Sequence, residues 1–253
     1  MTESQTAPFQ MILEELGQVR ARAQRSHENL ASAHPAWPVG KDGRLTAFAK
    51  ISNVLTAAEF AVLFLERHLS DATWWAVTFT QRPSPPDATI IVTEFSQFSK
   101  DGLLQGAFGA VESSLRVILR ALDSAACNRG TAEFKSVYDC LLRSKLVPPN
   151  LDDVVLLDFA RALRNTVHNN GVYYHRLAAE VDLRYRGRLY SFRQGLPVEF
   201  ADWELVIKLV DDLVGLLERV VTNGVVDRIP SIIDPCASEP VLPNPHTRPA
   251  GIA

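Results

Sequence analysis

The feature that most constrains the fold is a set of long segments in which apolar residues recur at helical spacing. One of them, LTAFAKISNVLTAAEFAVLFLERHL at residues 45–69, is too apolar to lie free in solvent and should be packed. Another, at residues 201–221, has a wide apolar face built around Trp203, Val206, Leu209, Val210, Leu213 and Leu217. The chain is therefore expected to be mainly α-helical.

Further helices are predicted at residues 9–30, 98–123 and 131–146, and another should follow the Pro148-Pro149 pair, capped by Asn150 or Asp152. Between the helices, β-branched and aromatic runs flank the breaker QRPSPPD, which predicts short strands or an extended loop within residues 73–95.

A β-hairpin is predicted at residues 181–193, where apolar and polar residues alternate around an Arg186-Gly187 turn. The alternation puts one set of side chains on a single face that can lie against helices, namely Val181, Leu183, Tyr185, Tyr190 and Phe192. The hairpin also carries Arg184, Arg186 and Arg188 beside Tyr190, a composition suited to holding phosphates and stacking RNA bases. The competing interpretation is that the aromatic residues belong to the core.

The predicted architecture is mainly α, an antiparallel helical bundle with a small β-hairpin insertion. In this prediction, residues 1–97 form an N-terminal helical segment that packs on the bundle at residues 98–226. Residues 227–253 are proline-rich and aperiodic, which predicts a disordered tail.

Composition limits the partners. The chain has 26 basic and 29 acidic residues and a formal charge of -3, so any nucleic-acid contact must be local. The three cysteines, Cys127, Cys140 and Cys236, have no zinc spacing, and free thiols in the cytoplasm are expected, with no metal and no cofactor. No secretory signal and no apolar run of about 20 residues is recognised, so no membrane is expected as a partner.

Polar residues cluster on the helix that follows Asn150. At about 100° per residue, Arg161, Arg164, Asn165 and His168 fall within an arc of about 100° along two turns. The opposite side holds the core face, made of Val155, Leu156, Phe159, Ala160, Leu163 and Val167. Toward the N-terminus the polar stripe runs into Val154 and Leu157, which a monomer would leave exposed, so a second copy of the chain is expected to cover them.

These side chains suit one reaction in particular. An imidazole can exchange a proton with a ribose 2′-hydroxyl or a departing 5′-oxygen, and a guanidinium can stabilise the charge on a pentavalent phosphorane without a metal. Asn165 could orient the imidazole or hold a phosphate oxygen. The competing interpretation is structural, because His168 suits a helix C-terminus and Asn169-Asn170-Gly171 suits an ordinary helix stop.

The long helix with AVESSLRVIL, followed by a helix carrying LRNTVHNNG, resembles the HEPN (higher eukaryotes and prokaryotes nucleotide-binding) superfamily over residues 98–221. The resemblance implies a helical bundle, a homodimer and, in active members, a metal-independent ribonuclease of toxin–antitoxin or defence systems. It makes RNA and an antitoxin or regulatory protein the candidate partners. Members that keep the bundle without cleaving RNA imply the alternative, a nucleotide-binding or protein-interaction module.

The resemblance carries over residue by residue. Active members separate an arginine from a histidine by four to six residues; here six separate Arg161 from His168, whereas three separate Arg164 from it. His168 is thus the candidate proton-transfer residue, Arg161 or Arg164 the phosphate stabiliser, and Asn165 the polar aid. Glu112 is a candidate support that could fix one of these arginines, or else a simple i,i+4 partner of Arg116. His68 and His175 are expected to be surface histidines.

Overall fold

The computed structural model describes residues 7–80, 83–126, 133–175 and 179–236, which are mainly helical with one small antiparallel sheet. The α-helices are α1 (Ala7–Ala33), α2 (Gly43–Phe64), α3 (Ala72–Thr78), α4 (Pro85–Leu122), α5 (Phe134–Asp139), α6 (Leu151–Val167), α7 (Trp203–Val221) and α8 (Gly224–Asp227). Two π-helical turns, η2 (Leu65–Leu69) and η3 (Cys140–Lys145), continue α2 and α5. The strands are β1 (Val181–Tyr185) and β2 (Arg188–Phe192).

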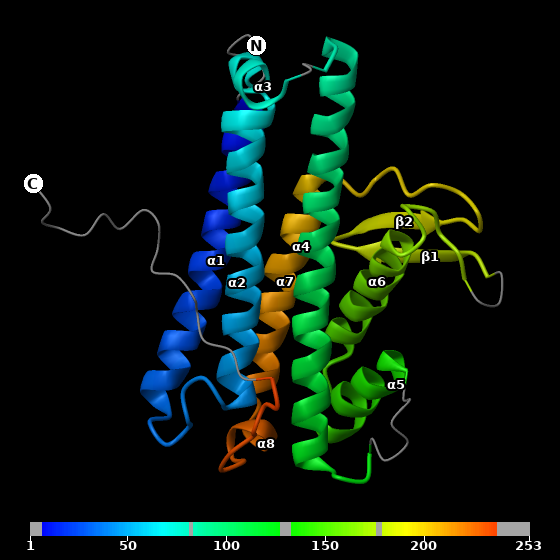
Figure 1. Ribbon diagram of the computed structural model, residues 1–253. Helices are drawn as coiled ribbons and strands as arrows, with labels where there is room; N and C mark the ends of the chain where they lie inside the picture. Colours follow the sequence, from blue (N-terminus) through cyan, green and yellow to red (C-terminus); the bar gives the residue numbers. More distant parts are fainter. Residues whose placement is uncertain (1–6, 81–82, 127–132, 176–178, 237–253) are drawn as a thin grey trace, which may run out of the picture.

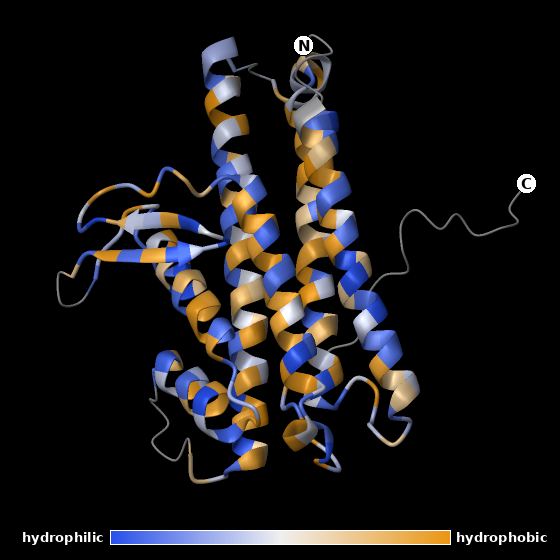
Figure 2. Cartoon of the chain, turned by 180° about the vertical axis from the view of Figure 1, so that it is seen from behind, coloured by the Kyte–Doolittle hydropathy of each residue, from blue (hydrophilic) through white to orange (hydrophobic). Residues whose placement is uncertain are grey.

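The four longest helices, α1, α2, α4 and α7, lie side by side, and α6 with the hairpin flanks α4 on one side (Figure 1). Hydrophilic and hydrophobic residues both occur along each of these helices (Figure 2). The predicted helices at 9–30, 45–69 and 201–221 are thereby confirmed, as is the helix that follows Asn150. Asn150 caps that helix, because its side chain accepts a hydrogen bond from the backbone N–H of Asp153.

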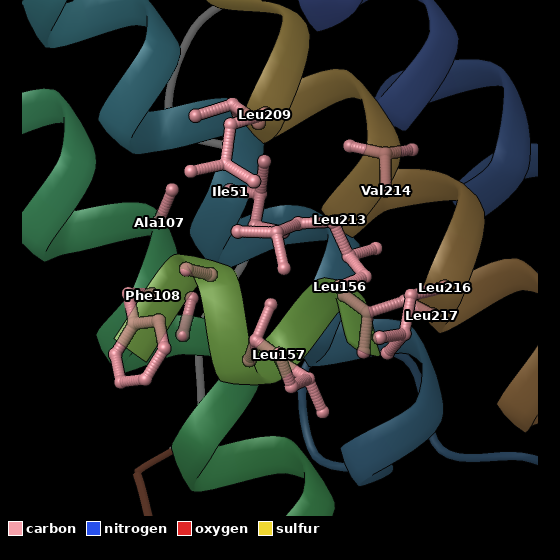
Figure 3. Packing of buried hydrophobic residues seen from close by; sticks show 14 of the residues in the cluster. Ile51, Ala107, Phe108, Leu156, Leu157, Leu209, Leu213, Val214, Leu216 and Leu217 are labelled. Atoms are coloured by element: carbon pink, nitrogen blue, oxygen red, sulfur yellow. The ribbon is translucent and has the colours of Figure 1, made fainter. Parts of the chain in front are cut away.

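The main core lies where α2, α4, α6 and α7 meet (Figure 3). Ile51 of α2, Phe108 of α4 and Leu213 of α7 are fully buried there or nearly so. The apolar face predicted on α7 is therefore the one that packs inward. Burying side chains of this size is worth about 1.5–3 kcal/mol each, which makes α7 a principal source of stability.

The hairpin forms with the predicted turn. Val181 pairs with Phe192 and Tyr185 with Arg188, which leaves Arg186 and Gly187 as the two turn residues. Their φ angles of 47° and 79° are those of a type I′ turn, whose twist matches that of the strands it joins. The aromatic face packs on Phe159 of α6, with ring centroids 4.6 Å from Tyr185, 5.1 Å from Tyr190 and 6.0 Å from Phe192.

The strands expected within residues 73–95 are wrong, because α3 and the first turns of α4 occupy most of the described part of this region. The side chain of Asp71 caps α3, and that of Ser84 caps α4 by accepting from the backbone N–H of Asp87. Pro85 stands in the first turn of α4, where its missing N–H costs nothing. The motif interpreted as a breaker is therefore a helix start.

The disordered tail expected at residues 227–253 is also wrong for its first part. Residues 228–236 are ordered against the start of α2: Ile232 is buried, and Ile233 forms a β-bridge with Asp42. Asp234 accepts hydrogen bonds from the hydroxyl of Thr46 and the ammonium of Lys50, each at 2.5 Å. Residues 237–253 lie outside the described part of the chain.

One segment, Gly43–Leu69, is long and apolar enough to cross a membrane, with a mean hydropathy of 1.5 over its most apolar window. The expectation that no run approaches that length is therefore wrong for α2 with η2. Half of the window is buried inside the protein, and a buried core helix passes the same test of length and composition.

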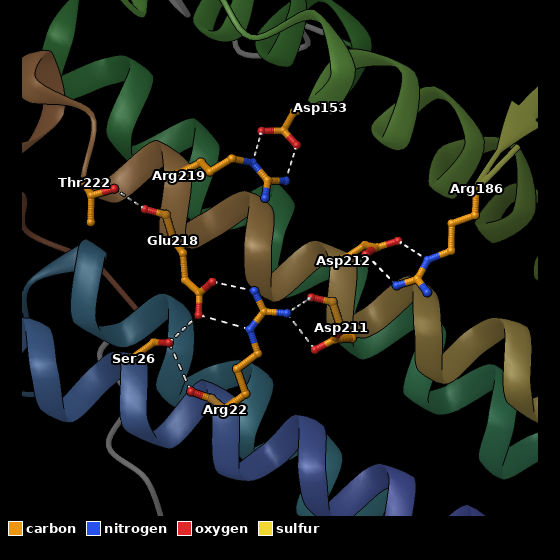
Figure 4. A network of polar contacts seen from close by, with 9 residues as sticks. All are labelled: Arg22, Ser26, Asp153, Arg186, Asp211, Asp212, Glu218, Arg219 and Thr222. Carbon is orange, nitrogen blue, oxygen red and sulfur yellow. Dashed lines mark hydrogen bonds and ion pairs between the residues drawn. The ribbon is translucent and has the colours of Figure 1, made fainter.

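Ion pairs tie α7 to its neighbours (Figure 4). On one side, Arg22 of α1 binds both Asp211 and Glu218 of α7. On the other, Arg219 of α7 binds Asp153 of α6, and Asp212 accepts from Arg186 of the hairpin turn. The described thiols of Cys140 and Cys236 are free, and Cys127 lies outside the described residues.

Candidate functional site

The four polar residues predicted on α6 open into one cleft of about 680 Å³. Arg161, Arg164, Asn165 and His168 form its α6 wall. The rest of the lining comes from α4, from the start of α5 and from the chain beyond α6, namely Phe108, Glu112, Glu133, Phe134, Lys135, Asn169, Tyr174 and His175. Residues far apart in sequence therefore converge on the stripe.

The end of α6 sets where the cleft histidine lies. His168 is the C-terminal cap residue of α6, and the chain then turns through Asn170 and Gly171, which have φ angles of 55° and 81°. The N–H of Gly171 donates to the carbonyl of Thr166 at 2.9 Å, which closes the helix end. The predicted helix stop at Asn169-Asn170-Gly171 is thus present, and it sends the following residues back along the cleft.

The expectation that Val154 and Leu157 would be exposed is wrong, because both side chains are fully buried. Helix α6 contacts α4, α5, η3, α7 and β1, so it packs on more than one side. Val155, assigned to the core face, is instead 49% exposed. The homodimer stays a prediction of the family resemblance, but the bare apolar patch that supported it does not exist.

Arg161 lines the cleft among polar groups. Its guanidinium is 3.8 Å from the carboxylate of Asp158, and its Nε is buried without a partner among the described residues. Burial raises the pKa of Tyr138 and of Tyr173, and the positive charge of Arg161 opposes both rises. Arg161 therefore has a fixed position and donor capacity that the described contacts do not use up.

Arg164 is held more lightly than Arg161. Its Nη1 donates to the side-chain oxygen of Asn165 at 3.4 Å, and its guanidinium carbon lies 5.7 Å from the centre of the Phe108 ring. No carboxylate of a described residue forms an ion pair with Arg164. Its charge is thus available to an anion that enters the cleft.

Asn165 does not orient His168. Its side-chain oxygen accepts from Arg164, and its backbone carbonyl accepts from the amide of Asn169 at 3.1 Å. In the described part of the chain the imidazole of His168 has no hydrogen-bond partner. Asn165 therefore supports the arginine rather than the histidine.

Glu112 lines the cleft but pairs along its own helix. Its Oε1 accepts from Nη2 of Arg116 at 2.7 Å, an i,i+4 ion pair. The structural interpretation of Glu112 is confirmed, and the direct pairing with Arg161 or Arg164 is not present. Pairing with Arg116 partly neutralises the carboxylate at the cleft wall.

The hairpin residues lie away from this cleft. Tyr190, predicted to stack on RNA bases, is buried and packs on Phe200 with ring centroids 4.9 Å apart, so that part of the prediction is wrong. Arg186 is engaged by Asp212, while the side chain of Arg188 lies 5.1 Å over the Tyr190 ring. Arg184 and Arg186 instead line a smaller cavity of about 300 Å³, together with acidic residues of α6 and α7.

Several residues that line the cleft were not assigned to a site from the sequence, among them Lys135, Tyr174 and His175. Lys135 donates to the carboxylate of Asp158 at 2.9 Å, and Tyr174 is 55% exposed. His175 was interpreted as a surface histidine, yet it lies in the same cleft as His168. No local sequence signal could have found it, because its place depends on how residues 171–175 pair with residues 194–198.

No group of three or more His, Cys, Asp or Glu side chains that could hold a metal ion occurs among the residues that the structure describes. Comparisons of the chain with protein families, with curated proteins and with solved structures found no match.

Proposed function

We propose that the protein is a HEPN-like antiparallel helical bundle that cleaves RNA in the α6 cleft without a metal ion, as a toxin or defence ribonuclease. The observation that carries the proposal is the convergence of His168, Arg161 and Arg164 on one open cleft. A volume of about 680 Å³ is within the range of sites that hold small ligands, and a nucleotide is of that size.

Charge in the cleft favours a phosphodiester. Arg161 and Arg164 offer guanidinium groups that can each bind two phosphate oxygens. Of the carboxylates at the wall, Glu112 is paired with Arg116. Because the whole chain has a formal charge of -3, attraction to a phosphodiester has to come from a local cationic site such as this one.

The nature of the lining favours a single-stranded substrate. The exposed ring of Tyr174 stands at the cleft beside His175 and offers a face on which an unpaired base can stack. A duplex would keep its bases stacked on each other and out of reach. An RNA loop or single-stranded linker is therefore the substrate class that fits.

One observation favours a second candidate, a nucleotide-binding module that does not cleave. Asn165 contacts Arg164 and leaves the imidazole of His168 without a described partner, so nothing within the chain orients that ring. The cationic cleft alone would still bind a nucleotide phosphate. The homodimer, an antitoxin or regulatory protein and a cytoplasmic location belong to the ribonuclease proposal as predictions.

The test is cleavage of single-stranded RNA by the purified protein in excess EDTA. Wild type should leave 2′,3′-cyclic phosphate ends, and His168→Ala should lower the rate about 10²- to 10⁴-fold. His68→Ala is the matched control, because His68 lies in η2, away from the cleft, and this variant should cut like wild type.

Three outcomes would contradict the ribonuclease proposal. If wild type binds the RNA but leaves it intact, and Arg164→Ala does not bind it, the binding module is favoured. Cleavage that disappears with EDTA, or that is unchanged in His168→Ala, would show that the metal-free site is not in this cleft.

A further inference from the structure

Transesterification of RNA moves two protons. One leaves the 2′-hydroxyl as its oxygen attacks phosphorus, and one must reach the departing 5′-oxygen. In an in-line displacement the attacking and departing oxygens lie on opposite sides of phosphorus, so a single imidazole such as that of His168 serves only one of them. We propose, resting on the ribonuclease function above, that His175 is the second proton-transfer residue and that one chain holds the complete catalytic site.

Both histidines line the same cleft, but they are supplied by different elements. His168 ends α6, whereas His175 belongs to the extended segment that follows the Asn170-Gly171 turn. A phosphate bound in this cleft can therefore be approached by imidazoles from two different elements.

Backbone hydrogen bonds hold the segment that carries His175. The N–H of Tyr173 donates to the carbonyl of Leu196 at 3.0 Å, and the N–H of Gly195 donates to the carbonyl of Tyr173 at 2.8 Å. The N–H of His175 itself donates to the side-chain oxygen of Gln194 at 2.9 Å. These bonds hold the main chain up to the N–H of His175, which positions the residue as a catalytic group must be.

Other charged groups of the cleft complete the site. Arg161 and Arg164 both line the cleft from α6, so their guanidinium groups can receive the phosphate oxygens. Lys135 contacts Asp139 and Asp158, and Glu112 contacts Arg116, so these charges are balanced within the fold. Glu133 is the remaining acidic residue of the lining.

The reaction balances with the groups present. A neutral imidazole takes the 2′-hydroxyl proton, the O2′–P bond forms and the P–O5′ bond breaks. The imidazolium of the other histidine gives its proton to the 5′-oxygen. The products are a 2′,3′-cyclic phosphate and a 5′-hydroxyl, and the two histidines have exchanged protonation states.

A single-chain site agrees with the buried positions of Val154 and Leu157. These residues were expected to be covered by a second copy, and they are covered by the chain itself. Both proton-transfer groups and both arginines belong to one cleft of one protomer. A second copy is then not needed to complete the site.

The first test compares His168→Ala and His175→Ala on two single-stranded RNA substrates, one natural and one with sulfur in place of the bridging 5′-oxygen. On natural RNA each variant should lose about 10²- to 10⁴-fold in kcat with little change in KM. A thiolate leaves without a proton, so the sulfur substrate should rescue only the variant that lacks the acid. Circular dichroism confirms that each variant is folded.

A second measurement mixes the two inactive variants. A complete site in each chain predicts that the mixture stays inactive, whereas restored cleavage would show that the histidines act from different copies and would overturn the single-chain site. Cleavage by His175→Ala at the wild-type rate, with His168→Ala inactive, would reject His175 and leave the ribonuclease intact. Failure of wild type to cleave either substrate would reject the proposed function itself.

Discussion

Arg44 has no exposed side-chain surface and neither has its partner Asp42. The guanidinium donates to both carboxylate oxygens of Asp42, at 2.9 and 2.8 Å, and to the carbonyls of Val226 and Ile229. It also lies 3.5 Å from the centre of the Trp37 ring. These contacts satisfy the buried charge and join the start of α2 to the residues that follow α7.

Arg44→Met should lower the free energy of unfolding by about 3–5 kcal/mol, because it leaves the carboxylate of Asp42 buried without a counter-charge. The double variant Asp42→Asn/Arg44→Met should recover part of that loss, since an asparagine can still cap α2. Urea unfolding of the single and double variants measures both. A single-variant loss below about 1 kcal/mol would contradict this account of the pair.

Residues within a few positions of each other were the predictable part of the site. Arg161, Arg164, Asn165 and His168 share one stripe because helix geometry fixes neighbours up to two turns apart, and they do share a cleft. His175 was not predictable, because its contacts run to Gln194, across the hairpin, and depend on the tertiary fold.

At the scale of elements, the long helices were predictable from periodicity but α3 was not, and helix limits depended on caps. Ser84 and Pro85 begin α4 well before the expected start at Phe98, and β-branched residues in its first turns do not prevent the helix. The faces of α6 were predicted less well. A helix that packs on several neighbours buries residues outside a single arc, as Val154 and Leu157 do.

The packing of α4 against α2 depends on Gly106. A Cβ built there would lie 2.8 Å from a γ-methyl of Val54, whereas a Cβ at Gly109 on the same helix would meet nothing within 4 Å. Gly109→Ala should raise the free energy of unfolding by about 0.5–1 kcal/mol, because alanine costs less backbone entropy in a helix. Gly106→Ala has the same favourable entropy effect, but overpacking against Val54 should lower its free energy of unfolding by about 1–3 kcal/mol.

Thermal or urea unfolding of the two variants should therefore rank Gly109→Ala above Gly106→Ala by at least about 1 kcal/mol. Both variants replace glycine by alanine within the same helix, so helix propensity contributes equally to the two stabilities. Equal stabilities would show that α2 and α4 do not approach as closely as the contact with Val54 requires.

At the scale of the molecule, the mainly helical class and the hairpin were predictable, but the way the parts are joined was not. Arg22, Asp153 and Arg186 reach α7 from α1, α6 and the hairpin turn, and each contact spans a long stretch of sequence (Figure 4). Gly215 makes room for this arrangement, since a Cβ there would lie 3.0 Å from a guanidinium nitrogen of Arg22.

These contacts make stability depend on pH. Burial raises the pKa of Glu218, but hydrogen bonds from Arg22 and Ser26 outweigh burial and leave the pKa below its usual value of 4.5. At Asp212, burial likewise raises the pKa of the carboxyl, and hydrogen bonds from Arg186 and Tyr185 lower it. The net effect leaves the pKa of Asp212 below its usual value of 3.8. A carboxyl whose pKa is depressed by folding stabilises the native state above its unfolded pKa and stops doing so as pH falls through its folded pKa.

The free energy of unfolding should therefore fall between about pH 5 and about pH 3 as Glu218 and Asp212 take up protons. Glu218→Gln should cost about 0.5–1 kcal/mol at neutral pH, a modest value because Arg22 and Glu218 are each about one third exposed, and the difference from wild type should shrink toward about pH 3. Glu199→Gln is the matched control, because Glu199 is exposed and makes no ion pair with any residue in the described ranges. Urea unfolding of the three proteins across this pH range makes the comparison. A difference between Glu218→Gln and wild type that stays constant with pH would mean that the Arg22–Glu218 pair does not carry the acid sensitivity.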